Sequence, residues 1–233
     1  EKVQHWYQLA EVDVASSVSS ATVVCFGDSI TDGHGSTTNG NDRWPDLLAQ
    51  HFPSKAPSAG WGVANEGIGG NRLLTDGMGE NALGRLDRDV FGVTDVRVMV
   101  VLEGINDIGT LTRGKTATPE EHARLVADME AAYKQIVDRA HSHGIRVIGA
   151  TMTPFMGSDY YKPTAANEAD RVAVNQWILA PGHFDSAVDL DAVTRDEKDP
   201  SRMKAAFDSG DHLHPGPAGY KAMADAVWAG MSK

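Results

Sequence analysis

The sequence of 233 residues is poor in cysteine, has no excess of positive charge and contains no long hydrophobic run. Its single cysteine, Cys25, excludes an intrachain disulfide and any CxxC redox or zinc motif. Lys and Arg number 21 against 32 Asp and Glu, which gives a net charge of −11. Because such a surface repels phosphate backbones, we expect no nucleic-acid partner. No apolar stretch approaches the roughly 18–20 residues of a membrane span, so we expect no transmembrane segment.

Apolar and amphipathic segments alternate along the chain, and 41% of its residues are hydrophobic, which is enough for a sizeable core. Short β-branched runs predict strands, and apolar residues at helical spacing predict helices. The predicted strands are residues 22–26, 62–65, 96–102, 145–150 and 187–190, and the predicted helices are residues 43–52, 81–90, 119–143, 167–179 and 217–231. This alternation predicts an α/β fold in which helices cover both faces of a mostly parallel sheet.

The first 21 residues fit this pattern less well. They contain two aromatic residues, Trp6 and Tyr7, followed by a serine-rich stretch over residues 15–21. We interpret residues 1–21 as an edge segment and linker, and residues 22–233 as one domain.

The loops after the predicted strands are where a site is expected, because ligands of parallel α/β sheets bind beyond the carboxyl ends of the strands. Three of these loops hold Ser29, the glycine pair 69–70 and Asn106, and a loop near the C-terminus holds Asp211 and His214. Each feature alone has an ordinary explanation, such as a helix cap or a turn. Together they supply a hydroxyl, an imidazole, a carboxylate and N–H donors, the groups that acyl transfer to water requires.

Four sequence blocks resemble those of the SGNH hydrolases, also called the GDSL esterase/lipase family. They are FGDSITDG at residues 26–33, NEGIGG at 65–70, GIND at 104–107 and DHLH at 211–214. Further stretches resemble a bacterial subgroup of GDSL acylhydrolases, namely residues 43–46, 70–74, 153–155 and 209–215. The resemblance extends from residue 22 to the C-terminus. It implies a three-layer α/β/α sandwich with a parallel sheet of about five strands.

The resemblance also implies a catalytic triad, position by position. Ser29 would be the nucleophile and His214 the general base that takes its proton. Asp211 would hold the imidazole in one tautomer and stabilise its charged form.

The same resemblance implies an oxyanion hole made of three donors. These are the backbone N–H groups of Ser29 and Gly70 and the side-chain amide of Asn106. Gly70 has no side chain to obstruct a carbonyl oxygen, and Asn106 donates in every protonation state. A slip of one residue in the glycine pair would move the second donor to Gly69.

The activity implied by the resemblance is that of a serine esterase that forms an acyl-enzyme and needs no cofactor and no metal. The polar loop at residues 32–41 and the lack of a long apolar stretch favour short acyl groups, with O-acetyl groups on carbohydrates as a candidate. Family habit implies secretion or export to the periplasm, and the sequence leaves a cytoplasmic location and the oligomeric state open.

Several side chains are candidates for contacts with a small-molecule or carbohydrate ester. Asp28 flanks the nucleophile and Arg72 follows the glycine pair. Phe155, Tyr160 and Tyr161 lie in an aromatic segment after a predicted strand. A structural role is an equal alternative for each, as a cap for Asp28, an ion pair for Arg72 and a satellite hydrophobic cluster for the aromatic residues.

Three other functions stay open at this point. A lysophospholipase or thioesterase would prefer longer acyl chains, and a carbohydrate-binding module would have lost catalysis. A metal-dependent phosphodiesterase would use Asp28, Asp107 and His214, and a chelator would abolish its activity.

Overall fold

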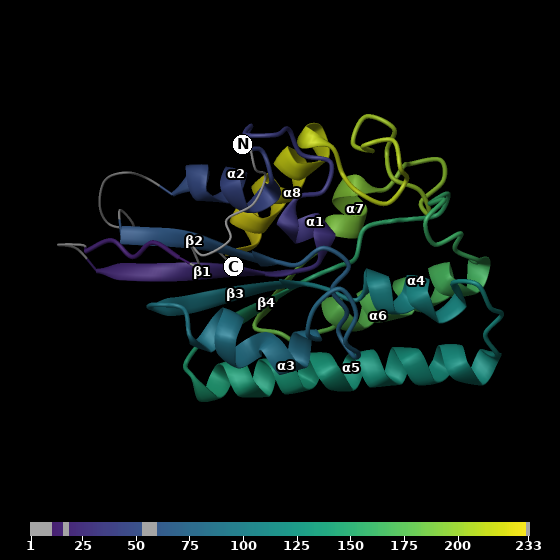
Figure 1. Cartoon of the computed structure of the whole chain (residues 1–233), viewed down its shortest axis with the longest axis horizontal. Helices are drawn as coiled ribbons and strands as arrows, with labels where there is room; N and C mark the ends of the chain where they lie inside the picture. The colour runs from purple at the N-terminus through teal and green to yellow at the C-terminus, as the bar shows by residue number, and fades with distance from the viewer. Residues whose placement is uncertain (1–10, 16–18, 53–59, 232–233) are drawn as a thin grey trace, which may run out of the picture.

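The computed structural model describes residues 11–15, 19–52 and 60–231. Its centre is a sheet of five parallel strands in the order β2-β1-β3-β4-β5 (Figure 1). The strands are β1 (Ser20–Gly27), β2 (Gly60–Gly67), β3 (Val96–Leu102), β4 (Arg146–Ala150) and β5 (Ser186–Val188). Because all five strands run parallel, their carboxyl ends lie at one edge of the sheet, where a doubly wound sheet binds its ligands.

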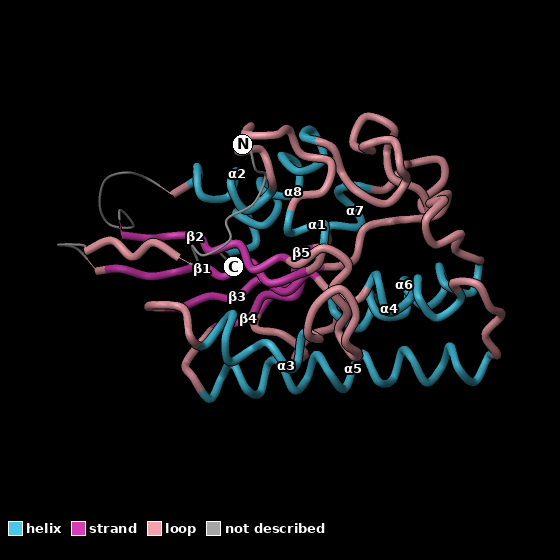
Figure 2. The backbone as a smooth tube through the Cα atoms, in the orientation of Figure 1, coloured by secondary structure: helices cyan, strands magenta, loops and turns pink. Residues whose placement is uncertain are grey.

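Helices cover both faces of the sheet (Figures 1 and 2). One face carries α1 (Ser29–Asp32), α2 (Trp44–His51), α7 (Leu190–Thr194) and α8 (Pro217–Met231). The other carries α3 (Ala82–Leu86) with a π-helical turn (Asp87–Phe91), α4 (Ile105–Thr112), α5 (Pro119–Ser142) and α6 (Ala165–Leu179). The predicted three-layer α/β/α sandwich with five parallel strands is therefore confirmed.

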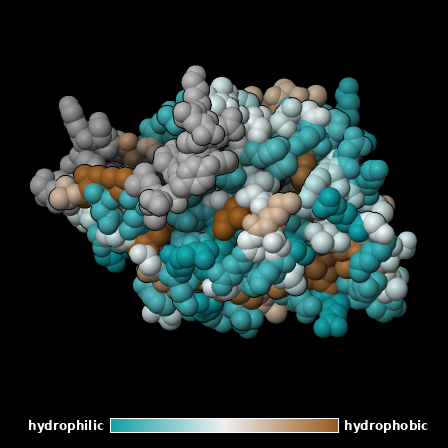
Figure 3. All heavy atoms as spheres, viewed as in Figure 1, coloured by the Kyte–Doolittle hydropathy of each residue, from teal (hydrophilic) through white to brown (hydrophobic). Residues whose placement is uncertain are grey.

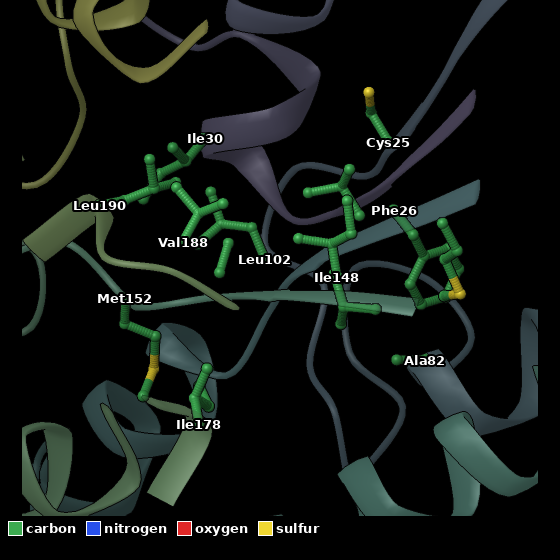
Figure 4. Close-up of a cluster of buried hydrophobic side chains, with 14 of the residues drawn as sticks. Cys25, Phe26, Ile30, Ala82, Leu102, Ile148, Met152, Ile178, Val188 and Leu190 are labelled. Atoms are coloured by element: carbon green, nitrogen blue, oxygen red, sulfur yellow. The ribbon is translucent and has the colours of Figure 1, made fainter. Parts of the chain in front are cut away.

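The core lies between the sheet and these two helix layers. Strands buried on both faces are apolar at consecutive positions rather than at alternate ones, and β3 accordingly buries every residue of its second half. Ile30 and Leu190 lie on one side of the sheet, and Met152 and Ile178 lie on the other (Figure 4). Cys25 belongs to this core, and burial raises the pKa of its thiol well above the usual value.

The long helix α5 shows how the sequence sets its own limits. The Thr118 hydroxyl accepts the N–H of Glu121, and the Glu121 carboxylate accepts the N–H of Thr118, so the two residues form a capping box. Gly144 follows the helix with a φ of +70°, a conformation that a glycine adopts without strain. The prediction of a helix over residues 119–143 is correct to within one residue.

Several boundaries differ from the predictions, two of them for a clear physical reason. β1 begins at Ser20, inside the predicted linker, because Ser20 and Ala21 pair with the start of β2. The strand predicted at 187–190 ends early, because the Asp189 carboxylate caps α7 and makes Leu190 helical. The short helices α1, α4 and α7 were not predicted. The rest of the predicted edge segment and linker, at residues 1–10 and 16–18, lies outside the described residues.

The molecular surface shows apolar residues only in small separate patches among hydrophilic ones on the viewed face (Figure 3). None of the helices in the described part of the chain combines the length and the apolar character needed to cross a membrane.

Candidate active site

The loop after β1 places Ser29 at the carboxyl edge of the sheet. The Asp28 carboxylate accepts the N–H of Ile30 at 2.9 Å, which caps α1 and makes Ser29 its first residue. Gly27 lets the chain turn here, since a Cβ atom on it would lie 2.5 Å from the carbonyl oxygen of Leu102. The turn is tight enough to leave Ser29 only 9% exposed.

A chain of hydrogen bonds connects Ser29 with the loop before α8. The Oγ atom of Ser29 lies 2.8 Å from Nε2 of His214, and Nδ1 of the same ring lies 2.6 Å from Oδ2 of Asp211. The second oxygen of Asp211 accepts the N–H groups of Leu213 and His214 at 2.9 and 2.8 Å. These bonds fix the turn from Asp211 to His214, so the imidazole is oriented before any ligand arrives.

The protonation of this pair suits proton transfer. Burial lowers the pKa of His214 below its usual value, and the Asp211 carboxylate opposes that effect only in part. For Asp211, burial raises the pKa, but the hydrogen bonds from His214 and Leu213 outweigh it and lower the pKa to about 2. At neutral pH the imidazole is therefore free to accept a proton from Ser29, beside a carboxylate that is ionised.

Asn106 lies at the start of α4, which follows β3 at the same edge of the sheet. Its Nδ2 donates to the carbonyl oxygen of Asn71 at 2.6 Å, and its Oδ1 accepts the hydroxyl of Tyr161 at 2.6 Å. With one hydrogen bond on each end, the amide has a single orientation. The second proton of Nδ2 stays available, because the amide has two N–H bonds and Asn71 takes one.

The glycine pair forms a turn beside Asn106. The N–H of Asn71 donates to the carbonyl oxygen of Ile68 at 3.0 Å, and Gly70 has a φ of +72°. Among the described residues, the N–H groups of Ser29, Gly69 and Gly70 find no hydrogen-bond acceptor. Unpaired N–H groups next to a hydroxyl nucleophile are the donors that a developing oxyanion needs.

The buried side chain of Arg85 connects three of these chain segments by hydrogen bonds. Its guanidinium is fully buried and donates to the carbonyl oxygens of Gly27 and Glu66 at 2.9 and 2.8 Å, and to the side chain of Asn71 at 2.9 Å. It also donates to Glu103 at 3.3 Å, a buried carboxyl whose pKa burial raises well above the usual value. Arg85 thus connects the ends of β1 and β2 with the glycine turn.

The structure corrects two of the predicted substrate contacts. Asp28 is only 1% exposed and caps α1, so it is not available to a substrate. Phe155 is fully buried, with its ring edge-on to that of Tyr161 in the core. The aromatic composition of a segment does not distinguish a pocket wall from a core cluster, and Phe155 belongs to a core cluster.

The other predicted contacts lie at or near the surface. Tyr160 is 45% exposed, and its hydroxyl accepts a hydrogen bond from Arg113. Arg72 lines a cavity of about 300 Å³ together with Leu74, Asp107 and Lys115, among others. The Asp107 carboxylate accepts the N–H groups of the two residues after Arg72, so this cavity adjoins the glycine turn.

The residues of the metal-dependent alternative do not converge. Asp28 accepts a helix N–H, Asp107 accepts two loop N–H groups, and His214 contacts Ser29 and Asp211. In the part of the chain that the structure describes, neither Asp28 nor Asp107 belongs to a group of three ligand side chains. This arrangement does not suit a phosphodiesterase of that kind.

Sequence reasoning missed several contributors to this site. Asn71 and Arg85 carry no motif, because their importance comes from tertiary contacts. Tyr161 was considered only as a substrate wall, whereas its hydroxyl orients Asn106. His34 lies in the polar loop 32–41, and its ring contacts that of His214 in a tilted arrangement, with the centroids 4.1 Å apart.

Comparison with known proteins gives a consistent result. The profile of the GDSL-like lipase/acylhydrolase family matches residues 25–222. No curated protein matches the chain significantly.

Several solved structures share the fold. A GDSL-like lipase from Bacteroides thetaiotaomicron has 17% identity and a TM-score of 0.61, over 88% of this chain and 85% of that one. An acetyl xylan esterase has 19% identity and a TM-score of 0.63, over 89% and 98%. A carbohydrate acetylesterase from Sinorhizobium meliloti has 15% identity and a TM-score of 0.64, over 89% and 96%.

Proposed function

Since the chain belongs to the GDSL-like lipase/acylhydrolase family and is a carboxylic ester hydrolase, we propose that it is a serine esterase that cleaves short-chain esters through an acyl-enzyme. One observation carries the mechanism. The Ser29 hydroxyl, the His214 ring and the Asp211 carboxylate form a continuous chain of hydrogen bonds of 2.8 and 2.6 Å at the carboxyl edge of the sheet.

In the first half of the proposed reaction, Oγ of Ser29 attacks the ester carbonyl carbon while its proton moves to Nε2 of His214. The carbonyl oxygen becomes an oxyanion held by the N–H groups of Ser29 and Gly70 and by Nδ2 of Asn106. Asp211 stabilises the imidazolium. The tetrahedral species then releases the alcohol, which takes the proton from His214, and the acyl group stays on Ser29.

In the second half, water attacks the acyl-Ser29 carbonyl carbon and gives a proton to His214. The same three donors hold the oxyanion. Collapse breaks the bond to Oγ of Ser29, the proton returns to Oγ, and the carboxylic acid leaves. One ester and one water are consumed and one alcohol and one carboxylic acid are released, so the cycle closes with the enzyme unchanged.

The proposed substrates are small acyl esters, with acetyl groups on carbohydrates as the preferred class. The cavity of about 300 Å³ beside the glycine turn has charged side chains, Arg72, Asp107 and Lys115, among its lining residues, which supports a small polar ester. Two fold neighbours, an acetyl xylan esterase and a carbohydrate acetylesterase, support the same class. We also propose secretion or export to the periplasm, as the family resemblance implies.

The test compares initial rates on p-nitrophenyl esters from acetate to decanoate for the wild type, Ser29→Ala and Ser142→Ala. Ser142 is an exposed serine at the end of α5 whose hydroxyl contacts only the carbonyl oxygen of Arg139 and the neighbouring His143 ring, so its variant controls for the loss of a hydroxyl. We expect the highest kcat/KM on acetate or butyrate, no activity for Ser29→Ala and full activity for Ser142→Ala. Rates that rise with chain length would identify a longer-acyl hydrolase instead, and an active Ser29→Ala would overturn the nucleophile.

A further inference from the structure

A second imidazole lies over the proposed triad. The ring of His34 is tilted by 43° against the ring of His214, with the centroids 4.1 Å apart. Its Nε2 lies 3.7 Å from Oδ2 of Asp211. One ligand atom from each of these three residues falls within 4.8 Å of the others. The proposed mechanism uses Asp211 and His214 but gives His34 no role.

The backbone of His34 is fixed from two directions. Its N–H donates to the carbonyl oxygen of Ser29 at 2.9 Å, and its own carbonyl oxygen accepts the hydroxyl of Tyr220 at 2.6 Å. The side chains of His34 and Asp211 remain 62% and 41% exposed. An ion in solution can therefore reach these two side chains directly, and they come from a rigid part of the fold.

We propose that His34, Asp211 and His214 bind a divalent transition-metal ion, with Zn²⁺ as the best fit, and that the bound ion reversibly inhibits the esterase. Two imidazole nitrogens and one carboxylate oxygen form a donor set that suits Zn²⁺ or Cu²⁺, whereas Mg²⁺ and Ca²⁺ require oxygen ligands. In a tetrahedral zinc site, neighbouring ligand atoms lie about 3.3 Å apart. Small side-chain rotations bring these three atoms to that spacing, and water completes the coordination.

Inhibition follows because a bound metal occupies a ring nitrogen of His214 that the proposed mechanism needs. Its Nε2 faces Ser29 and its Nδ1 faces Asp211, so a metal on either atom replaces a hydrogen bond of the triad. A metal on Nδ1 also displaces the proton there into solution. The inhibitory effect depends on the proposed function, whereas the binding site itself does not.

Metal binding is tested first without any substrate. Isothermal titration calorimetry with zinc chloride is carried out on the wild type, Ser29→Ala, His34→Ala and His51→Ala. His51 is the matched control, because it is also a partly exposed histidine paired with an aspartate, Asp225, at 2.9 Å. We expect one high-affinity zinc in the wild type, Ser29→Ala and His51→Ala, and an affinity at least about tenfold weaker in His34→Ala, as for the loss of a ligand.

Inhibition is tested second, with each variant measured relative to its own zinc-free rate on p-nitrophenyl acetate. Zinc should inhibit the wild type and His51→Ala alike, EDTA should restore the rate, and magnesium at the same concentration should have no effect. The inhibitory concentration for His34→Ala should rise by about tenfold or more. Equal zinc affinity and equal inhibition with and without His34 would overturn the proposal. If no ester is hydrolysed, the proposed function fails, and calorimetry still decides whether the site exists.

Discussion

The hydroxyl of Tyr161 donates a hydrogen bond of 2.6 Å to Oδ1 of Asn106. Tyr161 comes from the loop after β4 and Asn106 from the start of α4, which follows β3, and the two meet beside the glycine turn. A flipped amide would place Oδ1 against the carbonyl oxygen of Asn71 and leave the Tyr161 hydroxyl facing Nδ2. Because a carbonyl oxygen cannot donate, the contact with Asn71 sets which end of the amide faces the proposed oxyanion, and the Tyr161 hydroxyl holds Oδ1 in that position.

Replacing Tyr161 by Phe should therefore reduce catalysis more than binding. The substitution keeps the ring and its packing against Phe155 but removes the donor that orients Asn106. We expect kcat on p-nitrophenyl acetate to fall by roughly 10–100-fold, less than the full loss of an oxyanion donor, while KM changes little. Steady-state kinetics on both parameters provide the measurement.

Tyr160→Phe is the matched control for that experiment. Its hydroxyl bonds to Arg113 at the surface rather than to Asn106, so its kcat should remain within about twofold of the wild type. If the two tyrosine variants behave alike, Asn106 is not oriented by Tyr161.

Alanine substitutions in the glycine pair test which residue supplies the second oxyanion donor. Gly70 has a φ of +72°, and a Cβ on it would lie 2.7 Å from Sδ of Met78. At Gly69, the nearest atom to such a Cβ is Oδ2 of Asp32 at 3.7 Å, which is ordinary contact. Gly70→Ala should strain the turn by about 1 kcal/mol and displace its N–H, so kcat should fall by about tenfold or more.

Gly69→Ala should retain most of the activity under the same conditions. The thermal midpoint of both variants should be recorded, so that unfolding is not mistaken for a loss of catalysis. A larger loss of kcat in Gly69→Ala than in Gly70→Ala would assign the donor to Gly69.

The pH dependence of the reaction should follow His214. Because burial lowers the pKa of this imidazole, kcat/KM should rise with pH to a plateau that is reached at a lower pH than an exposed histidine would give. Asp211→Asn removes the carboxylate that raises the pKa of His214, so the acid limb should move to lower pH. The plateau should also fall by roughly 10³–10⁴-fold, because the imidazolium loses its partner. A variant that keeps the wild-type plateau would show that Asp211 has no part in catalysis.

The sequence patterns predict the fold well where one physical rule dominates. β3 is apolar at every position except Arg97 because both faces of the sheet are buried, and its bounds are predicted without error. The capping box of Thr118 with Glu121 similarly defines the start of α5. The helices α1 and α7 escape prediction because they have only four and five residues and depend on single aspartate caps rather than on a periodic apolar face.

The candidate site is predictable only as far as the family motifs reach. Ser29, Asp211 and His214 stand in such motifs, and the structure brings them together. Arg85 reads as an ordinary helical arginine, and only tertiary packing reveals that it is buried beneath three loops. His34 reads as part of a polar loop, and its position over His214 depends on a contact between residues 180 positions apart.

The cap of α1 should make the stability of the protein depend on pH. Burial, together with the negative charge of Asp107, raises the pKa of Asp28 from 3.8 to about 7. A carboxyl whose pKa is raised by folding contributes stability below the unfolded pKa, and that contribution is lost as pH rises through the folded pKa. Asp28 therefore favours the folded state at pH 4 and opposes it at pH 8.

Asp28→Asn should remove this dependence, because the amide oxygen can still accept the N–H of Ile30 but the side chain does not ionise. Relative to the wild type, the variant should gain on the order of 1–4 kcal/mol in unfolding free energy between pH 4 and pH 8. Urea unfolding at the two pH values gives this difference directly. Asp225→Asn is the control: the hydrogen bond from Lys221 lowers the pKa of that exposed carboxylate, so it stays largely ionised at both pH values and its substitution should change the pH dependence little. A relative stability of Asp28→Asn that does not change with pH would mean that the buried Asp28 carboxyl ionises as easily in the folded protein as in the unfolded chain.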